Sequence, residues 1–229
     1  TPDDPNSLSA RLARFEGALV AASSRPDAAD RLDSAVSEAR NLADGLRDAS
    51  KGVQEARGLA ERTIAAQVKQ LNTSLEQVQK LNISINRTIA QGGDTAGLMD
   101  LRQQHVDTIG ALVPLREIAR DGGKIALYSQ GGAALIDGQA ATIGFSPKNI
   151  VTSYMSVDTG TLSGLTINDQ PVRTGSDNGA LRGGTLGAQF AIRDELGVTA
   201  ASSTTSQIGV TALPPRVEPI TPFIADHPF

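Results

Sequence analysis

With 229 residues, the chain is long enough to bury a core, and its formal net charge is −4. Only 3% of the residues are aromatic, so we expect a core of Ala, Leu, Ile and Val, as in helix bundles and small β modules. The basic residues are scattered, which argues against nucleic acid as a partner, and no apolar run approaches the roughly 18 residues that membrane insertion needs. Cysteine is absent, which excludes disulfides and thiol catalysis.

The chain begins with a short helix and a longer helical region. Ser7 is a good N-cap, and the apolar stripe that follows predicts a first helix up to a break at residues 23–27. Helical periodicity then runs over residues 28–50. Glycines between residues 45 and 58 weaken this region, so the sequence leaves open whether it forms one helix or two.

Residues 64–89 carry the strongest pattern. Their apolar residues alternate spacings of three and four, with Asn82 in the one polar slot, which is the period of a helix seam that packs on a neighbouring helix. The glycines at 92–93 predict the end of this helix, and another helix is predicted up to Pro114. The residues expected to form the bundle seam are Val68, Leu71, Leu75, Val78, Ile85, Leu101, Ile109 and Leu112.

Beyond Pro114 the period changes from helix to strand. Short apolar or alternating runs, separated by Asp-Gly-Gly, Gln-Gly-Gly and Asp-Gly turn signals, predict one small antiparallel β module. Residues 171–184 are interpreted as a loop, and residues 185–196 return to the helical period. The predicted strands are 115–119, 124–129, 133–137, 140–145 and 162–168.

These elements predict an α+β fold, an elongated antiparallel α-helical bundle with an inserted small antiparallel β domain. The expected divisions are a helical bundle domain over 7–114, a β-rich domain over 115–180, a helix returning to the bundle over 181–201, and an extended or disordered tail over 202–229. The tail is assigned from its prolines and its missing periodicity.

Candidate chemical groups are few. The two histidines are His105, on an apolar helix face, and His227 in the tail, and no second ligand lies at a metal-binding spacing. The Asp-Gly-Gly-Lys run at 121–124 fails the phosphate-loop pattern, and Asp137 does not complete a calcium-loop spacing with it. We therefore predict that the chain is not an enzyme and has no catalytic residues, no metal site and no cofactor.

Several stretches together carry a resemblance to one family. They are LSARLARFEGALVAASSRPDAADRLDSAVSEARNLADGLRD, QVKQLNTSLEQVQKLNISINRTI, GLMDLRQQHVDTIGALV, KIALYSQGGAALIDG and LRGGTLGAQFAIRDEL. In the third, Leu98, Asp100, Arg102 and Val106 match an L-x-D-x-R-D-x-L-type helix of that family. Over roughly residues 7–201, the chain resembles the flagellar hook-associated protein 1 family, the first hook–filament junction proteins of bacterial flagella.

The resemblance implies a structural component of the bacterial flagellum, an adapter at the hook–filament junction on which flagellin assembly depends. It implies a homo-oligomeric ring that contacts the hook protein and the second junction protein, and flagellin only indirectly, with an export chaperone as a further candidate partner. The chain would be extracellular, exported unfolded by the flagellar type III apparatus without a cleaved signal peptide. The missing cysteines and the Gln, Asn, Ser and Thr of the helices fit this route.

Two departures from the family are visible. No extra N-terminal helix with a Gly-Tyr-Ser motif precedes Thr1, and SQIGVTALPPRVEPITPFIADHPF stands in place of the family's C-terminal helix. The chain is therefore expected to be a central fragment, or a truncated or divergent product.

Two alternatives stay open on the sequence. The first is a flagellin-like filament subunit or another axial protein, because flagellins share such helices and periodicity does not separate them; the Asp-Gly-Gly hairpin favours the junction protein. The second is a non-flagellar binding module or hydrolase with Asp121, Asp137 or His105 at its site.

Overall fold

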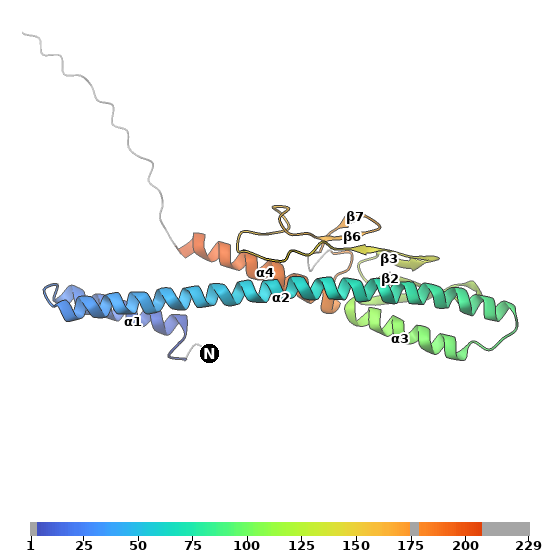
Figure 1. The fold of residues 1–229 in the computed structure, drawn as a ribbon, viewed down its shortest axis with the longest axis horizontal. Helices are drawn as coiled ribbons and strands as arrows, with labels where there is room; N and C mark the ends of the chain where they lie inside the picture. The colour runs from blue at the N-terminus through green and yellow to red at the C-terminus, as the bar shows by residue number, and fades with distance from the viewer. Residues whose placement is uncertain (1–3, 175–178, 208–229) are drawn as a thin grey trace, which may run out of the picture.

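A single long helix organises the computed structural model, which describes residues 4–174 and 179–207 (Figure 1). Helix α2 (Ala29–Ala90) has 62 residues. At 1.5 Å per residue it is about 93 Å long. The region whose continuity the sequence left open is therefore one unbroken helix. It ends where expected, because Gly92 takes a φ of 71°, a conformation in which a side chain would be strained.

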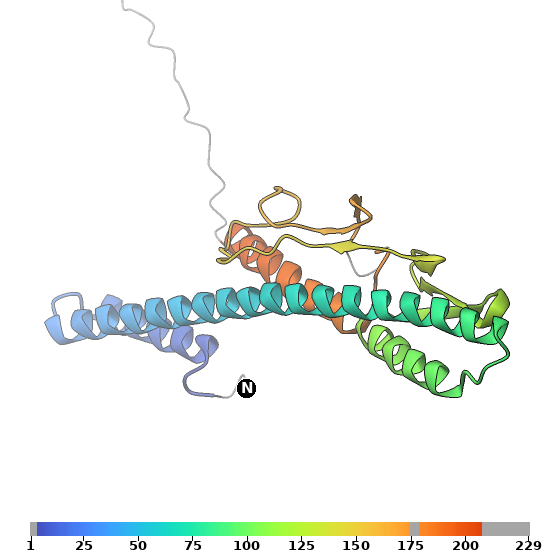
Figure 2. The same ribbon diagram turned by 45° about the vertical axis from the view of Figure 1, so that its right-hand side comes forward.

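Three shorter helices pack on α2 at different points along its length (Figures 1 and 2). Helix α1 (Leu8–Ser24) lies beside the N-terminal part of α2, and α3 (Ala96–Leu112) beside its C-terminal part. Helix α4 (Gly184–Gln207) lies along the middle. Ser7 caps α1, because its side-chain oxygen accepts a hydrogen bond from the Ala10 N–H at 3.2 Å.

Two small antiparallel sheets lie between α3 and α4 in the sequence and rest against α2 (Figure 2). The first has the order β1-β2-β3-β4 and consists of β1 (Leu115–Ala119), β2 (Ile125–Ser129), β3 (Ala134–Asp137) and β4 (Gln139–Ala140). The second has the order β5-β6-β7 and consists of β5 (Ile143–Gly144), β6 (Leu165–Ile167) and β7 (Gln170–Val172). A 3-10 turn at Asp121–Gly123 joins β1 to β2. The predicted α+β fold class is confirmed.

One hydrophobic core is shared by α2, α3, both sheets and α4. Its aromatic member is Phe190; aliphatic side chains fill the rest, as the composition predicted. The buried residues of this core include Ile64, Val68, Leu71, Leu75, Val78, Val106, Ile109, Leu112, Ile125, Leu127, Ile136, Ile143, Leu165 and Leu186. The sheets therefore form one packed body with the middle and the C-terminal part of α2.

The β region differs from its prediction in two ways. The single expected module is two sheets, because the predicted strand 140–145 divides into the end of β4 and the separate strand β5. Strand β7 occupies residues that were interpreted as loop. Asn168 and Asp169 take φ values of 50° and 65°, which gives the two-residue hairpin turn that pairs β6 with β7.

The C-terminal prediction is wrong over residues 202–207, which continue α4 and do not begin an extended tail. Neither glycine nor proline occurs between residues 198 and 207, so nothing in the local sequence stops the helix. The rest of the predicted tail, 208–229, and His227 lie outside the described residues. In the described part of the chain, no helix combines the length and the apolar character needed to cross a membrane.

Candidate functional site

The residues expected to form the bundle seam occupy two different environments. Those that are buried are Val68, Leu71, Leu75, Val78, Ile85, Ile109 and Leu112. Leu101 is 44% exposed, so its assignment to the buried seam is wrong. Its neighbour Arg102 faces α2 instead, and Val106, one helical turn further on, takes the apolar position of α3.

Amide side chains of α2 bind main-chain groups of a strand in each sheet. The Asn72 side chain donates to the Ile143 carbonyl at 2.8 Å and accepts from the Ile143 N–H at 2.8 Å. Asn82 does the same with Ile125, at 2.8 Å and 3.1 Å. Each amide thus takes the place of a peptide group of a neighbouring strand and satisfies both main-chain groups of one residue. Asn82, the polar residue of the predicted seam pattern, thus holds the start of β2 against α2.

The same row continues with two further contacts. Gln79 accepts a hydrogen bond from the Ala140 N–H at 2.9 Å. Arg102 of α3 donates to the Asn82 side-chain oxygen at 2.9 Å and to the Gly123 carbonyl at 2.7 Å. Burial lowers the pKa of the Arg102 guanidinium. Arg102 therefore ties α3, α2 and the Asp-Gly-Gly turn together at one point.

A buried ionic cluster joins α2 to α4. Arg193 donates to Glu61 Oε2 at 3.0 Å, to the Ser163 carbonyl at 2.9 Å and to Asp194 Oδ1 at 2.7 Å. The Lys148 N–H donates to the other Glu61 oxygen at 2.9 Å. Arg193 and Glu61 are both 0% exposed. Because each charge has an opposite charge and further hydrogen bonds, the cluster satisfies its buried groups.

Arg57, one turn before Glu61, holds the loop between β5 and β6. Its guanidinium nitrogens donate to the main-chain carbonyls of Arg193 at 2.8 Å, Thr152 at 2.9 Å and Met155 at 2.6 Å. Burial lowers the pKa of Arg57. The residue is 1% exposed, so this loop, α2 and α4 meet at a single side chain.

The exposed face of the first sheet carries a polar triad. The Tyr128 hydroxyl donates to Asp137 Oδ2 at 2.7 Å, and Arg120 donates to the same carboxylate oxygen at 3.1 Å. The hydrogen bond between the Tyr128 hydroxyl and the Asp137 carboxylate raises the pKa of Tyr128 and lowers the pKa of Asp137. The Asp137 carboxylate thus accepts hydrogen bonds from Tyr128 of β2 and from Arg120, which directly follows β1.

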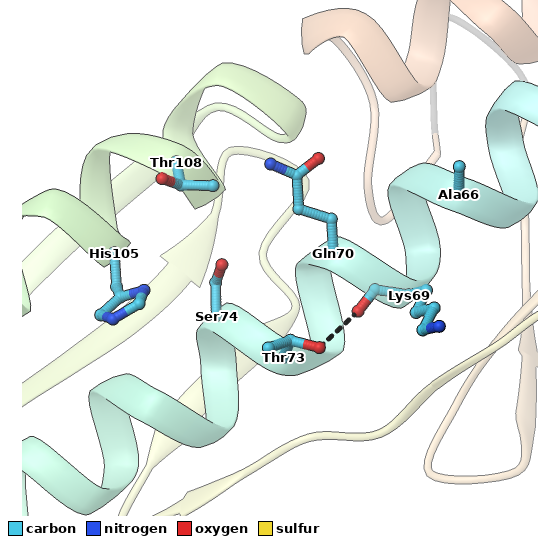
Figure 3. Close-up of a pocket in the computed structure, with 7 residues that line it drawn as sticks. All are labelled: Ala66, Lys69, Gln70, Thr73, Ser74, His105 and Thr108. Atoms are coloured by element: carbon cyan, nitrogen blue, oxygen red, sulfur yellow. Dashed lines mark hydrogen bonds between the residues drawn. The ribbon is translucent and has the colours of Figure 1, made fainter.

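A shallow groove of about 460 Å³ lies on the surface where α2 and α3 meet (Figure 3). From α3, His105 and Thr108 line it, and α2 contributes Ala66, Lys69, Gln70, Thr73 and Ser74. Figure 3 shows the side chains of His105 and Ser74 approaching each other across the groove. Among the described residues, no group of three or more His, Asp or Glu could hold a metal ion.

Apolar side chains are exposed on α1 and the first part of α2. Leu8, Leu12 and Leu19 follow one face of α1, and Leu32 and Val36 lie one turn apart on α2, each at least 38% exposed. Exposed apolar surface over two adjoining helices is typical of proteins that bind other proteins.

Comparison with known proteins identifies the family. The family model for the helical domain of the flagellar hook-associated protein FlgK matches residues 2–212. Among solved structures, the chain is similar to the flagellar hook junction protein FlgK from Burkholderia pseudomallei, with 18% sequence identity and a TM-score of 0.64. The similarity covers 82% of this chain and 33% of that chain, and at this identity it shows a shared fold. No curated protein matches.

The matched range takes in every helix and strand described above. The resemblance seen in the sequence motifs is thus confirmed: the chain belongs to the family of the helical domain of the flagellar hook-associated protein FlgK.

Proposed function

We propose that the chain is a structural adapter at the hook–filament junction of the bacterial flagellum, on which flagellin assembly depends. The observation that carries this proposal is the FlgK family match over residues 2–212. The family consists of structural flagellar proteins, so the chain is not an enzyme. The solved structure that shares the fold is itself described as a flagellar hook junction protein.

The proposed mechanism is geometric. An adapter must keep fixed distances between the subunits that it joins, and a continuous 62-residue helix braced by α1, α3 and α4 suits that task. The amide row and the ionic cluster lock both sheets onto α2. We assign the helical bundle, 7–114, to the inner part of the assembly and the β-rich domain, 115–180, to its outer face. The helix from residue 181 returns the chain to the bundle.

The proposed partners are further copies of the chain in a ring, the hook protein and the second junction protein, with flagellin contacted indirectly and an export chaperone as a further candidate. The exposed apolar residues of α1 and α2 support such contacts. We propose export through the flagellar type III apparatus without a cleaved signal, which the absence of cysteine supports.

Electron microscopy of source cells that lack the parent gene tests the junction role. Bare hooks, with flagellin released into the medium, are the expected result. Normal filaments would contradict the role and would favour a redundant filament subunit or a non-flagellar binding protein.

Complementation sharpens this experiment. A gene that carries Glu55→Ala should restore filaments, because the ion pair of Glu55 with Lys51 is exposed to solvent. A gene that carries Glu61→Ala should fail, because Arg193 would lose its buried partner. If both genes restored filaments equally, the rigid joint between α2 and α4 would not be needed for the role.

A further inference from the structure

The loop between β5 and β6 carries the most exposed large apolar side chains of the described residues. Tyr154 is 89% exposed and Ile150 is 74% exposed. Tyrosine is enriched at the centres of protein interfaces, where its ring is buried and its hydroxyl finds a polar partner. Two such side chains within five positions form a projection, which we call the Tyr154 knob.

The main chain beneath the knob is held firmly. Arg57 binds the carbonyls of Thr152 and Met155, on either side of Tyr154. Val151 is buried, and the Thr161 hydroxyl accepts a hydrogen bond from the Ser156 N–H at 3.0 Å. A projection that is already ordered loses little conformational entropy on binding.

The groove between α2 and α3 lies on the opposite side of α2 from the knob. Arg57 and Glu61 point to the loop, and Ala66 and Gln70 follow them by nine residues each. Nine residues are about 2.5 helical turns, which reverses the direction of a side chain. A knob on one flank and a groove on the other cannot meet within one chain, but they can meet between neighbouring copies.

The charges at the two places are complementary. Asp158 is exposed four residues after Tyr154, and Lys69 is exposed at the edge of the groove. Within residues 4–174 and 179–207, neither side chain has an ion-pair partner. The groove also presents His105 and Thr108, which can hydrogen-bond a phenol hydroxyl.

We propose that the Tyr154 knob of one copy inserts into the α2–α3 groove of a second copy of this chain, with Asp158 facing Lys69. The contact is heterologous, since different surfaces of the two copies meet, and such contacts generate rings or helical arrays. It gives the subunit contact of the proposed ring a location, and to that extent it rests on the proposed function.

Cysteine cross-linking of the purified chain tests this contact without background, because the chain has no cysteine of its own. Ser153→Cys places a thiol beside the knob, and Gln70→Cys places one in the groove. Oxidation of a mixture of the two single variants at high protein concentration should give a disulfide-linked dimer of two different chains. The matched control replaces Gln70→Cys with Glu55→Cys, an exposed α2 position outside the groove that lies about 22 Å before Gln70 along the helix.

Charge reversal supplies a second test. Cross-linking should fall several-fold when the knob chain carries Asp158→Lys or when the groove chain carries Lys69→Asp. A knob chain with Asp158→Lys mixed with a groove chain with Lys69→Asp should recover most of the yield, which a merely structural effect would not do.

Equal dimer yields from Gln70→Cys and the Glu55→Cys control would overturn the contact, and so would a failure of the paired reversals to recover the yield. Bare hooks in the deletion strain together with unselective cross-linking would leave the junction role intact and remove only the contact. Selective cross-linking together with normal filaments would keep the contact and remove the role.

Discussion

Asn82 of α2 and Ile125 of β2 exchange two hydrogen bonds, 43 residues apart in the sequence, in the pattern of two paired strand residues. The Asn82 oxygen also accepts a hydrogen bond from Arg102 of α3. One helical side chain thus satisfies both main-chain groups of Ile125, at the start of β2, and anchors a second helix.

We expect Asn82→Ala to destabilise the fold by about 2–4 kcal/mol, because the Ile125 main-chain groups and Arg102 would lose their partner in a buried place. Urea unfolding followed by circular dichroism measures the change. Asn86→Ala is the control, since Asn86 makes a single 3.2 Å bond to the Gly122 carbonyl, and it should cost about 1 kcal/mol. If both variants lost the same free energy of unfolding, the three hydrogen bonds of Asn82 would not stabilise the fold more than the one of Asn86.

Removing one partner of the buried Glu61–Arg193 pair should cost far more stability than removing one partner of an exposed ion pair on the same helix. Glu61→Ala removes the fully buried carboxylate partner of Arg193, which keeps only the partly exposed Asp194, and should cost about 3 kcal/mol in the free energy of unfolding. Glu55→Ala, at an exposed position of α2, should change stability by less than about 0.5 kcal/mol. A Glu61→Ala protein with an unchanged free energy of unfolding would show that Glu61 and Arg193 do not form their buried ion pair in solution.

Two glycines of α4 should respond to alanine with opposite signs. A Cβ at Gly197 would lie 2.6 Å from Arg57 Nη2, so Gly197→Ala should push on the loop clamp and destabilise by about 1–3 kcal/mol. A Cβ at Gly187 would have as its nearest neighbour the Arg182 carbonyl carbon, 3.7 Å away. Gly187→Ala should therefore stabilise the fold by up to about 1 kcal/mol, because alanine favours the helix more than glycine does. Thermal unfolding of both variants checks the difference in sign.

We propose that the buried seam residues hold the single chain together rather than contact partners. Leu75 is 0% exposed, so Leu75→Asp would bury an unpaired charge and should unfold the bundle. Leu101→Asp is the matched control on α3, because Leu101 is 44% exposed, and it should remain folded. A cooperative thermal transition for Leu75→Asp close to that of the unmodified chain would count against the seam.

The Tyr128 and Asp137 hydrogen bond should be visible in a phenol titration. The absorbance of the unmodified chain minus that of Tyr128→Phe reports Tyr128, whose pKa should lie above the ordinary value of about 10. Asp137→Asn should bring that pKa down, while Asp158→Asn should leave it in place.

The same pair sets opposite pH windows for stability. The lowered pKa of Asp137 gives a contribution that is present above the ordinary Asp range and is lost as the pH falls through the lowered value. The raised pKa of Tyr128 gives a contribution that is present below about 10 and is lost as the pH rises through the raised value. Both contributions should be small, because solvent screens the exposed pair.

The sequence predicted those parts of the fold that depend on local periodicity. The three-and-four spacing around Leu71 and Leu75 identified the buried face of α2, and Gly92 marked its end. The Asn168-Asp169 dipeptide was an available signal for the β6–β7 hairpin, although Pro171 and the residues after it were interpreted as a loop. Proline is tolerated there because β7 is an edge strand.

The ionic joint could not be predicted in the same way. Arg57 and Glu61 have the four-residue spacing of an ordinary charge pair on a helix surface. Their partners in α4 and in the β5–β6 loop lie far along the chain. No periodic pattern connects positions that only the tertiary fold brings together. Leu101 shows a second reason why the pattern misleads. It is apolar and was predicted to belong to the seam, but it faces outward because its neighbour Arg102 faces α2.

The distance along the chain between Arg57 and Arg193 has a consequence for the order of folding. Their hydrogen bond closes a separation of 136 residues, so the middle of α2 keeps unmatched charged groups until the segment around residue 193 has been synthesised. Contacts between such remote positions slow folding, because a long loop must close before they contribute. A nascent chain that ends before α4 therefore lacks the hydrogen bonds that join α2 to α4, and the partners of Arg57 and Glu61 are complete only once residue 193 has been added.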